Sequence, residues 1–81
     1  MSTRGFPWKV FLMIKLIRSK ATNGFLTSDG NWTPTVENAA RFPEESLARA
    51  AARQFQLHDV DLYYLYWEDA TSQHDFAIPL R

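Results

Sequence analysis

Two stretches of this chain, Trp8–Ile17 and Val60–Trp67, carry apolar or aromatic side chains on both faces of an expected strand. A strand with one buried face alternates apolar and polar residues, whereas a strand that is apolar on both faces needs cover on both. The sequence predicts one helix, and one helix covers one face of a small sheet. The cover of the other face is therefore the main question, and it points to a surface rather than to a chemistry.

Size, charge and composition limit the classes of protein to which this chain can belong. We expect a single domain over residues 1–81, with residues 1–6 as a flexible tail. Nine Lys and Arg balance nine Asp and Glu, so no overall positive field attracts nucleic acid. The absence of cysteine excludes disulfides and thiolate sites. Lys9 and Lys15 interrupt the first apolar run, which is too short to span a membrane, so we expect a cytoplasmic protein.

Hydrophobic alternation and turn signals predict four strands. These are Trp8–Ile17, Gly24–Thr27, Val60–Trp67 and Asp75–Leu80. Asn23-Gly24 and Ser28–Asn31 are turn sequences, and Trp32-Thr33-Pro34 is expected to leave the sheet because proline cannot donate to a central ladder. Pro79 marks the last strand as an edge.

Residues between the second and third strands predict the helical part of the chain. Val36–Ala40 is typical of a single helical turn. A longer helix is expected from Pro43, at its first position, to about Gln56. Leu47, Ala48, Ala51 and Phe55 form its apolar stripe, and Glu45, Arg49 and Arg53 form a solvated ion-pair face.

The order of elements is thus β-β-α-β-β, which predicts an α+β fold. Placing the first strand between the second and third makes every neighbouring pair antiparallel and gives the sheet order 2-1-3-4. The two strands that are apolar on both faces then lie at the centre, where burial requires them. We expect a single four-stranded antiparallel sheet with one helix packed on one face.

Residues that could support catalysis or metal binding do not form a convincing set. His58 and His74 have nearby carboxylates, but His58 follows a helix, where a cation interacts favourably with the dipole. Ser28 and Ser72 lie in no nucleophile elbow. The paired carboxylates fall at a helix start and in a hairpin loop, where solvated acidic residues are ordinary. We therefore expect no enzymatic activity, no metal and no cofactor.

The side of the sheet away from the helix is the candidate binding surface. We assign the even-numbered residues of Trp8–Ile17 to the helix side, together with Val60, Leu62 and Tyr64. The predicted partner-binding residues are then those of the other face: Lys9, Phe11, Met13, Lys15, Tyr63, Leu65 and Trp67. Asp61 shares this face.

Three occupants of this face remain open. The chain's own segments, Phe6-Pro7-Trp8 and Trp32–Phe42, could fold over it as a satellite cluster. A protein partner could cover it, either a second copy of this chain in a homodimer or a foreign protein, because exposed aromatic residues and Met are enriched at interfaces. Single-stranded nucleic acid could stack on its aromatic rings beside the lysines. The protein partner is the preferred hypothesis.

A resemblance to known proteins adds to this interpretation. The segment from Gly24 to Thr33, then Ala39-Ala40-Arg41-Phe42 and a helix with Ala48 and Ala51, resembles a pattern in small uncharacterised phage and bacterial proteins. That pattern has a basic first strand, a "gfLt-dG-Wt" hairpin, an "A-x-F" segment and a Glu/Ala-rich helix. The resemblance implies a phage-encoded protein, and by analogy an inhibitor of a host defence system, such as an anti-CRISPR protein that occludes a surface. It implies no catalytic residues.

Overall fold

The computed structural model describes residues 13–67 and 72–81. Its elements are β1 (Ile14–Ser19), β2 (Phe25–Leu26), β3 (Trp32–Thr33), a 3₁₀ helix (Val36–Asn38), α1 (Glu45–Gln54), β4 (Val60–Trp67) and β5 (Gln73–Pro79). The predicted tail, residues 1–6, and the first half of the predicted strand Trp8–Ile17 lie outside the described residues. The short helical turn expected over Val36–Ala40 is confirmed by the 3₁₀ helix.

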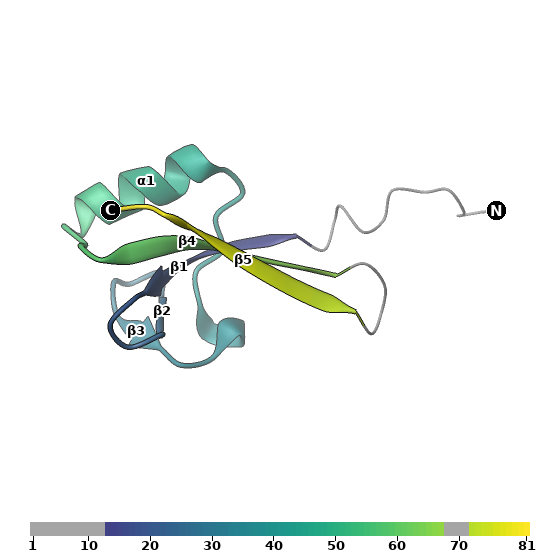
Figure 1. Ribbon diagram of the computed structural model, residues 1–81. Helices are drawn as coiled ribbons and strands as arrows, with labels where there is room; N and C mark the ends of the chain where they lie inside the picture. Colours follow the sequence, from purple (N-terminus) through teal and green to yellow (C-terminus); the bar gives the residue numbers. More distant parts are fainter. Residues whose placement is uncertain (1–12, 68–71) are drawn as a thin grey trace.

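The strands form one antiparallel sheet in the order β3-β2-β1-β4-β5 (Figure 1). The predicted α+β class and the order of the four expected strands are confirmed, with the two doubly apolar strands adjacent as β1 and β4. The predicted number of four strands is wrong, because Trp32 and Thr33 pair with β2 as a fifth strand. Pro34 follows these paired residues, so its missing N–H interrupts no ladder bond.

Two turns join the first three strands. The Ser19 N–H donates to Gly24 O at 2.8 Å, and Asn23 adopts a φ of 61°, as an asparagine in such a turn can. Gly30 has a φ of 89° in the second turn, which returns the chain to pair Trp32 with Leu26. An added Cβ on Gly30 would lie 2.8 Å from Cε1 of Phe55, so this turn packs against the end of α1.

Helix α1 covers one face of the sheet (Figure 1). Ala48 and Ala52 are fully buried against Ile17 and Leu62, and their small side chains allow close approach of helix and sheet. The predicted start at Pro43 is wrong by two residues, since Glu44 is the N-cap. Two members of the predicted apolar stripe, Leu47 and Phe55, are exposed, and Ala52 takes part in the buried face instead.

The helix ends in a Schellman motif. Leu57 N–H donates to Ala52 O at 2.8 Å, and Gln56 N–H donates to Arg53 O at 3.1 Å. Gln56 has the left-handed φ of 56° that this motif requires and that glycine usually supplies. The turn sends the chain back into β4, whose residues from Val60 to Leu65 are all buried.

A second buried cluster lies on the opposite face of the sheet. Leu16, Phe25, Tyr63 and Leu65 form it, and Val36 and Ala39 from the segment around the 3₁₀ helix pack against it. Figure 1 shows this segment and α1 on opposite sides of the sheet. Of the three open alternatives, cover by the segment Trp32–Phe42 is therefore confirmed for this part of the face.

The pairing of β1 with β4 corrects the predicted faces of the first strand. Ile17 pairs with Leu62, and Leu16 pairs with Tyr63. The odd-numbered residues of β1 therefore share the helix side with Leu62 and Tyr64, and the assignment of the even-numbered residues to that side is wrong. Leu16 and Ile17 are both fully buried, so alternation could not distinguish the two faces.

Candidate contact surface on the outer strands

Strand β5 carries the most exposed apolar surface of the sheet. All seven of its residues are exposed, and the sheet order places it at an edge, as Pro79 predicts. Among the described residues, β5 pairs only with β4. Phe76 and Ile78 are 45% and 40% exposed, although both lie on the side of the sheet that α1 covers elsewhere. Figure 1 shows the β4–β5 ribbon extending past the helix.

Four rings form a continuous surface on this ribbon, which we name the aromatic row: Tyr64, Tyr66, His74 and Phe76. Tyr64 and Phe76 stack with ring centroids 4.5 Å apart and planes inclined by 7°. Phe76 also meets Tyr66 edge-on at 6.1 Å, and Tyr66 stacks on His74 at 5.3 Å. Each contact lies within the range that favours aromatic pairs, so the rings hold one another in place.

One cation adjoins the aromatic row. Lys15 Nζ lies 5.8 Å from the centroid of the Tyr64 ring and donates to Pro43 O at 3.3 Å. The backbone supports this position, because the N–H of Phe42 donates to Lys15 O at 2.9 Å. The arrangement provides an apolar surface with a positive charge at one end, which suits contact with another molecule.

The structure does not bring the predicted partner-binding residues together. Lys9 and Phe11 lie outside the described residues. Met13, which is 41% exposed, precedes β1, and Lys15 lies on the helix side with Tyr64. Tyr63, Leu65 and Trp67 lie on the opposite side. The one-residue error in the face of β1 explains this separation, because it moves Lys15 to the other side of the sheet.

Tyr63 and Leu65 are buried rather than available for contact. Trp67 is partly exposed and borders a hollow of about 540 Å³ that Ile14, Val36 and Leu65 also line, with Glu37 and Arg41 beside them. This hollow is the part of the second face that the 3₁₀ segment leaves uncovered in the described structure.

Among the described residues, the hydroxyl of Tyr63 is the most strongly perturbed titratable group. It donates to Asp75 Oδ2 at 2.6 Å, and the Arg18 guanidinium lies 4.6 Å from the Tyr63 ring centroid. Burial, with the hydrogen bond to Asp75 and its negative charge, raises the pKa of Tyr63 to about 12, against a smaller opposing effect of Arg18. A tyrosine this hard to ionise is a structural donor and is poorly suited to act as a base near neutral pH.

Asp61 forms ion pairs with two cations on the same side of the sheet as Tyr63. It lies 3.5 Å from Arg18 Nη2 and 3.7 Å from Lys20 Nζ, and it is buried. Arg18 and Lys20 are therefore partly neutralised and do not form a basic patch for phosphate. Among Lys15, Arg18 and Lys20, Lys15 is the cation that adjoins the aromatic row, and it does so through the ring of the buried Tyr64.

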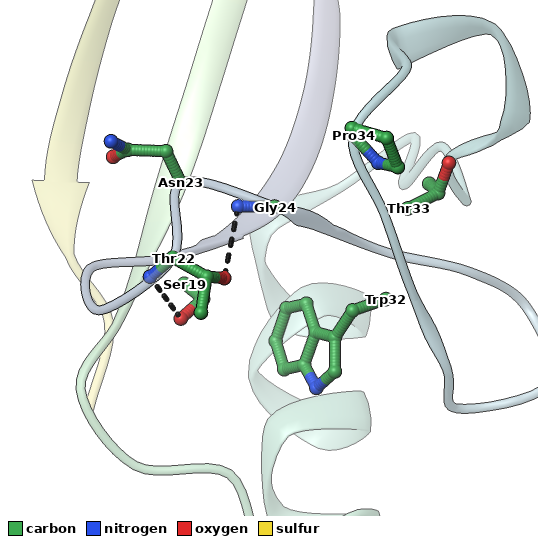
Figure 2. A pocket seen from close by; sticks show the side chains of 7 residues that line it. All are labelled: Ser19, Thr22, Asn23, Gly24, Trp32, Thr33 and Pro34. Atoms are coloured by element: carbon green, nitrogen blue, oxygen red, sulfur yellow. Dashed lines mark hydrogen bonds between the residues drawn. The ribbon is translucent and has the colours of Figure 1, made fainter.

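A further hollow lies beside the first turn. It has a volume of about 550 Å³ and is lined by Ser19, Thr22, Asn23, Gly24, Trp32, Thr33 and Pro34. Figure 2 shows the indole of Trp32 beside the turn, where Ser19 Oγ accepts the Thr22 N–H and Thr22 Oγ1 accepts the Gly24 N–H. Its lining combines hydroxyl and amide side chains with the Trp32 indole and carries no charged side chain.

Family models, curated proteins and solved structures were compared with this chain. None matches it. The described residues contain no group of three or more potential metal ligands. No helix within residues 13–67 and 72–81 is long and apolar enough to cross a membrane.

Sequence reasoning missed all four residues of the aromatic row and Ile78, although it included the neighbouring Lys15. Two signals could have found them. Pro79 already marked the last strand as an edge, and Phe76 and Ile78 alternate with Asp75 and Ala77 along it. Where an edge strand extends past the helix that covers the sheet, the apolar side of that strand stays exposed.

Proposed function

We propose that this protein is a non-enzymatic protein-binding module and that its contact surface is the aromatic row with Ile78 and Lys15. The observation that carries the proposal is the exposure of Phe76 and Ile78 on an edge strand, with Tyr64 stacked on Phe76 and Tyr66 edge-on to it. Large exposed apolar side chains that gather in one place mark interaction sites more often than scattered ones do.

The chemistry of the row fits a protein interface. Aromatic residues are enriched at interface centres, and they contribute much contact area at a small cost in side-chain entropy. Phe76 and Tyr64 hold each other in a stacked geometry, so a partner would find the surface already formed. Lys15 supplies a cation that favours a partner with a carboxylate next to its apolar contact.

Affinity capture from a bacterial lysate, with matched variants, tests the proposal. Phe76→Ala removes a ring of the row that is 45% exposed, and Leu47→Ala removes an apolar side chain of similar exposure from α1. We expect a partner that is retained by the wild type and by Leu47→Ala and is lost with Phe76→Ala. Equal retention by both variants, or no retained protein with the wild type, would reject the aromatic row as a contact surface for a foreign protein. Circular dichroism of each variant checks that it folds.

Single-stranded nucleic acid is the second candidate, and the position of Lys15 beside the Tyr64 ring favours it. Base stacking on aromatic rings contributes roughly 1–3 kcal/mol per base. Fluorescence anisotropy with a labelled oligonucleotide at low salt tests it, with Lys15→Gln as the variant. Binding that weakens with Lys15→Gln and with added salt would support this candidate, and the absence of binding would remove it.

The finer parts of the functional hypothesis rest on sequence alone and stay predictions. These are a phage origin, inhibition of a host defence system by surface occlusion, and a cytoplasmic location. The expected absence of enzymatic activity stays a prediction in the same way. The resemblance over the hairpin and the helix supports the phage origin, and the aromatic row gives occlusion a physical basis.

A further inference from the structure

The outer edge of β5 presents backbone groups as well as side chains. Leu80 N–H donates to Val60 O at 3.0 Å, which fixes the alternation of the ladder. Ile78, Phe76 and His74 therefore direct their backbone groups towards β4, and Gln73, Asp75, Ala77 and Pro79 direct theirs away from it. No strand among the described residues pairs with these outward groups. An unpaired edge of this kind is a template for another strand.

We propose that a second copy of this chain pairs with this edge, so that two β5 strands run antiparallel about a two-fold axis at Phe76. The sheet then continues from one copy into the other. The inference deepens the proposed function by naming the protein partner, and it therefore rests on that function. A two-fold interface requires a surface that is complementary to itself, and the edge of β5 meets this requirement.

Hydrogen bonding selects the register. With the axis at Phe76, Asp75 lies opposite Ala77 of the second copy, and each such pair exchanges two N–H···O bonds. Gln73 lies opposite Pro79 of the second copy, where its N–H donates to the proline carbonyl. The missing N–H of Pro79 thus removes a bond only at the two ends of the paired region.

Charge and bonding disfavour the two neighbouring registers. An axis at Asp75 would place two carboxylates directly opposite each other, which is destabilising. An axis at Ala77 would place Asp75 opposite Pro79 of the second copy. The missing proline N–H would then lie next to the centre of the paired region, and Gln73 would have no residue of β5 opposite it. The axis at Phe76 opposes no like charges and uses every outward N–H of β5.

Side chains favour the same register. The two Phe76 rings become a directly opposed pair on the helix side, and His74 lies opposite Ile78 of the second copy. The aromatic rows of the two copies then join across the axis. Two exposed apolar residues, Phe76 and Ile78, are removed from water in each copy. Asp75 stays on the other side of the sheet, where it keeps its hydrogen bond from Tyr63.

Sedimentation equilibrium of the full chain and of two Ala77 variants tests the dimer. Ala77→Pro removes an outward N–H without touching the bonds to β4, and proline is tolerated at an edge. Ala77→Ser keeps the N–H and serves as the matched control. We expect a wild-type dimer, a dissociation constant at least about tenfold higher for Ala77→Pro, and little change for Ala77→Ser. A monomeric wild type at concentrations of about 100 μM would overturn the proposal.

Single-cysteine variants test the register, because the chain has no cysteine of its own. Phe76→Cys, Asp75→Cys and Ala77→Cys each place one thiol along the edge. Directly opposed Cα atoms lie within disulfide range, so we expect rapid cross-linking under mild oxidation only for Phe76→Cys. Faster cross-linking of either other variant, or equal rates for all three, would overturn the register.

The two proposals fail separately. A monomeric chain that still loses a captured foreign protein with Phe76→Ala refutes the second copy and leaves the contact surface supported. If Ala77→Pro also releases that foreign protein, the edge of β5 accepts a foreign strand, which likewise overturns the dimer. A dimer that persists unchanged in Phe76→Ala and Ala77→Pro refutes the pairing through β5.

Discussion

Raising the pH above 10 should destabilise this protein through Tyr63, and Tyr63→Phe should remove part of that loss. Burial, with the hydrogen bond and charge of Asp75, raises the pKa of Tyr63 from 10.0 to about 12. Between these values the unfolded chain releases the phenolic proton and the folded chain keeps it. The folded state then binds more protons, so the free energy of unfolding falls as pH rises. Below pH 10 both states keep the proton and this stabilisation is fully present.

The size of the effect follows from the difference between the two pKa values. One pKa unit corresponds to about 1.4 kcal/mol, and at pH 11 roughly one unit of the difference has been expressed. Because Asp75 is exposed, solvent screening reduces the gain, and we expect a loss of about 1 kcal/mol between pH 9 and pH 11.

Urea unfolding at pH 9 and pH 11 measures this loss in the wild type and in Tyr63→Phe. Contributions that the two proteins share cancel, so the difference between the two losses isolates Tyr63. Asp75→Asn provides a second check, since removing the carboxylate charge should lower the pKa of Tyr63 and reduce the loss. Equal losses in the wild type and Tyr63→Phe would refute the reasoning.

Three further substitutions test the fold by urea unfolding at neutral pH. Gln56→Gly should stabilise the protein by about 0.5–1 kcal/mol, because glycine adopts the left-handed φ of the helix end at no steric cost, whereas Gln56→Ala should give no such gain. Gly30→Ala should destabilise it by about 1 kcal/mol or more, since the φ of 89° is unfavourable for alanine and the Cβ meets the Phe55 ring; an unchanged midpoint would contradict the packing of this turn. Leu16→Ala should cost about 2–5 kcal/mol, which checks that the second face is a true core, and a cost below about 1 kcal/mol would show that it is not.

The strand order could be predicted from the sequence because burial leaves few alternatives. Two strands that are apolar on both faces must lie inside the sheet, and one connecting helix fixes their relative direction. The fifth strand could not be predicted from Trp32 and Thr33 alone. Two residues carry no alternation, and the proline after them suggested an exit from the sheet. The pairing of β3 depends on the four-residue turn before it.

The apolar pattern of β1 does not show which of its residues face the helix, but its charged residues do. Arg18 pairs with Asp61 across the strands, so the even residues of β1 and the odd residues of β4 share one side. Using this ion pair would have placed Lys15 with Tyr64. The aromatic row depends in addition on how far the β4–β5 ribbon extends past α1, and the length of a strand beyond its helix is a property of the assembled fold.

The two fully buried neighbours Leu16 and Ile17 also bear on how reliably this chain folds. A slip of β1 by one residue would exchange two side chains of nearly equal volume, so the hydrophobic energy of the slipped sheet would be close to that of the native one. What separates the two pairings is the ion pair of Arg18 with Asp61 and the transfer of Lys15 to the wrong side. The register of β1 in this small protein therefore depends on its charged residues rather than on its apolar ones, and because Asp61 is buried, added salt should weaken that dependence only slightly.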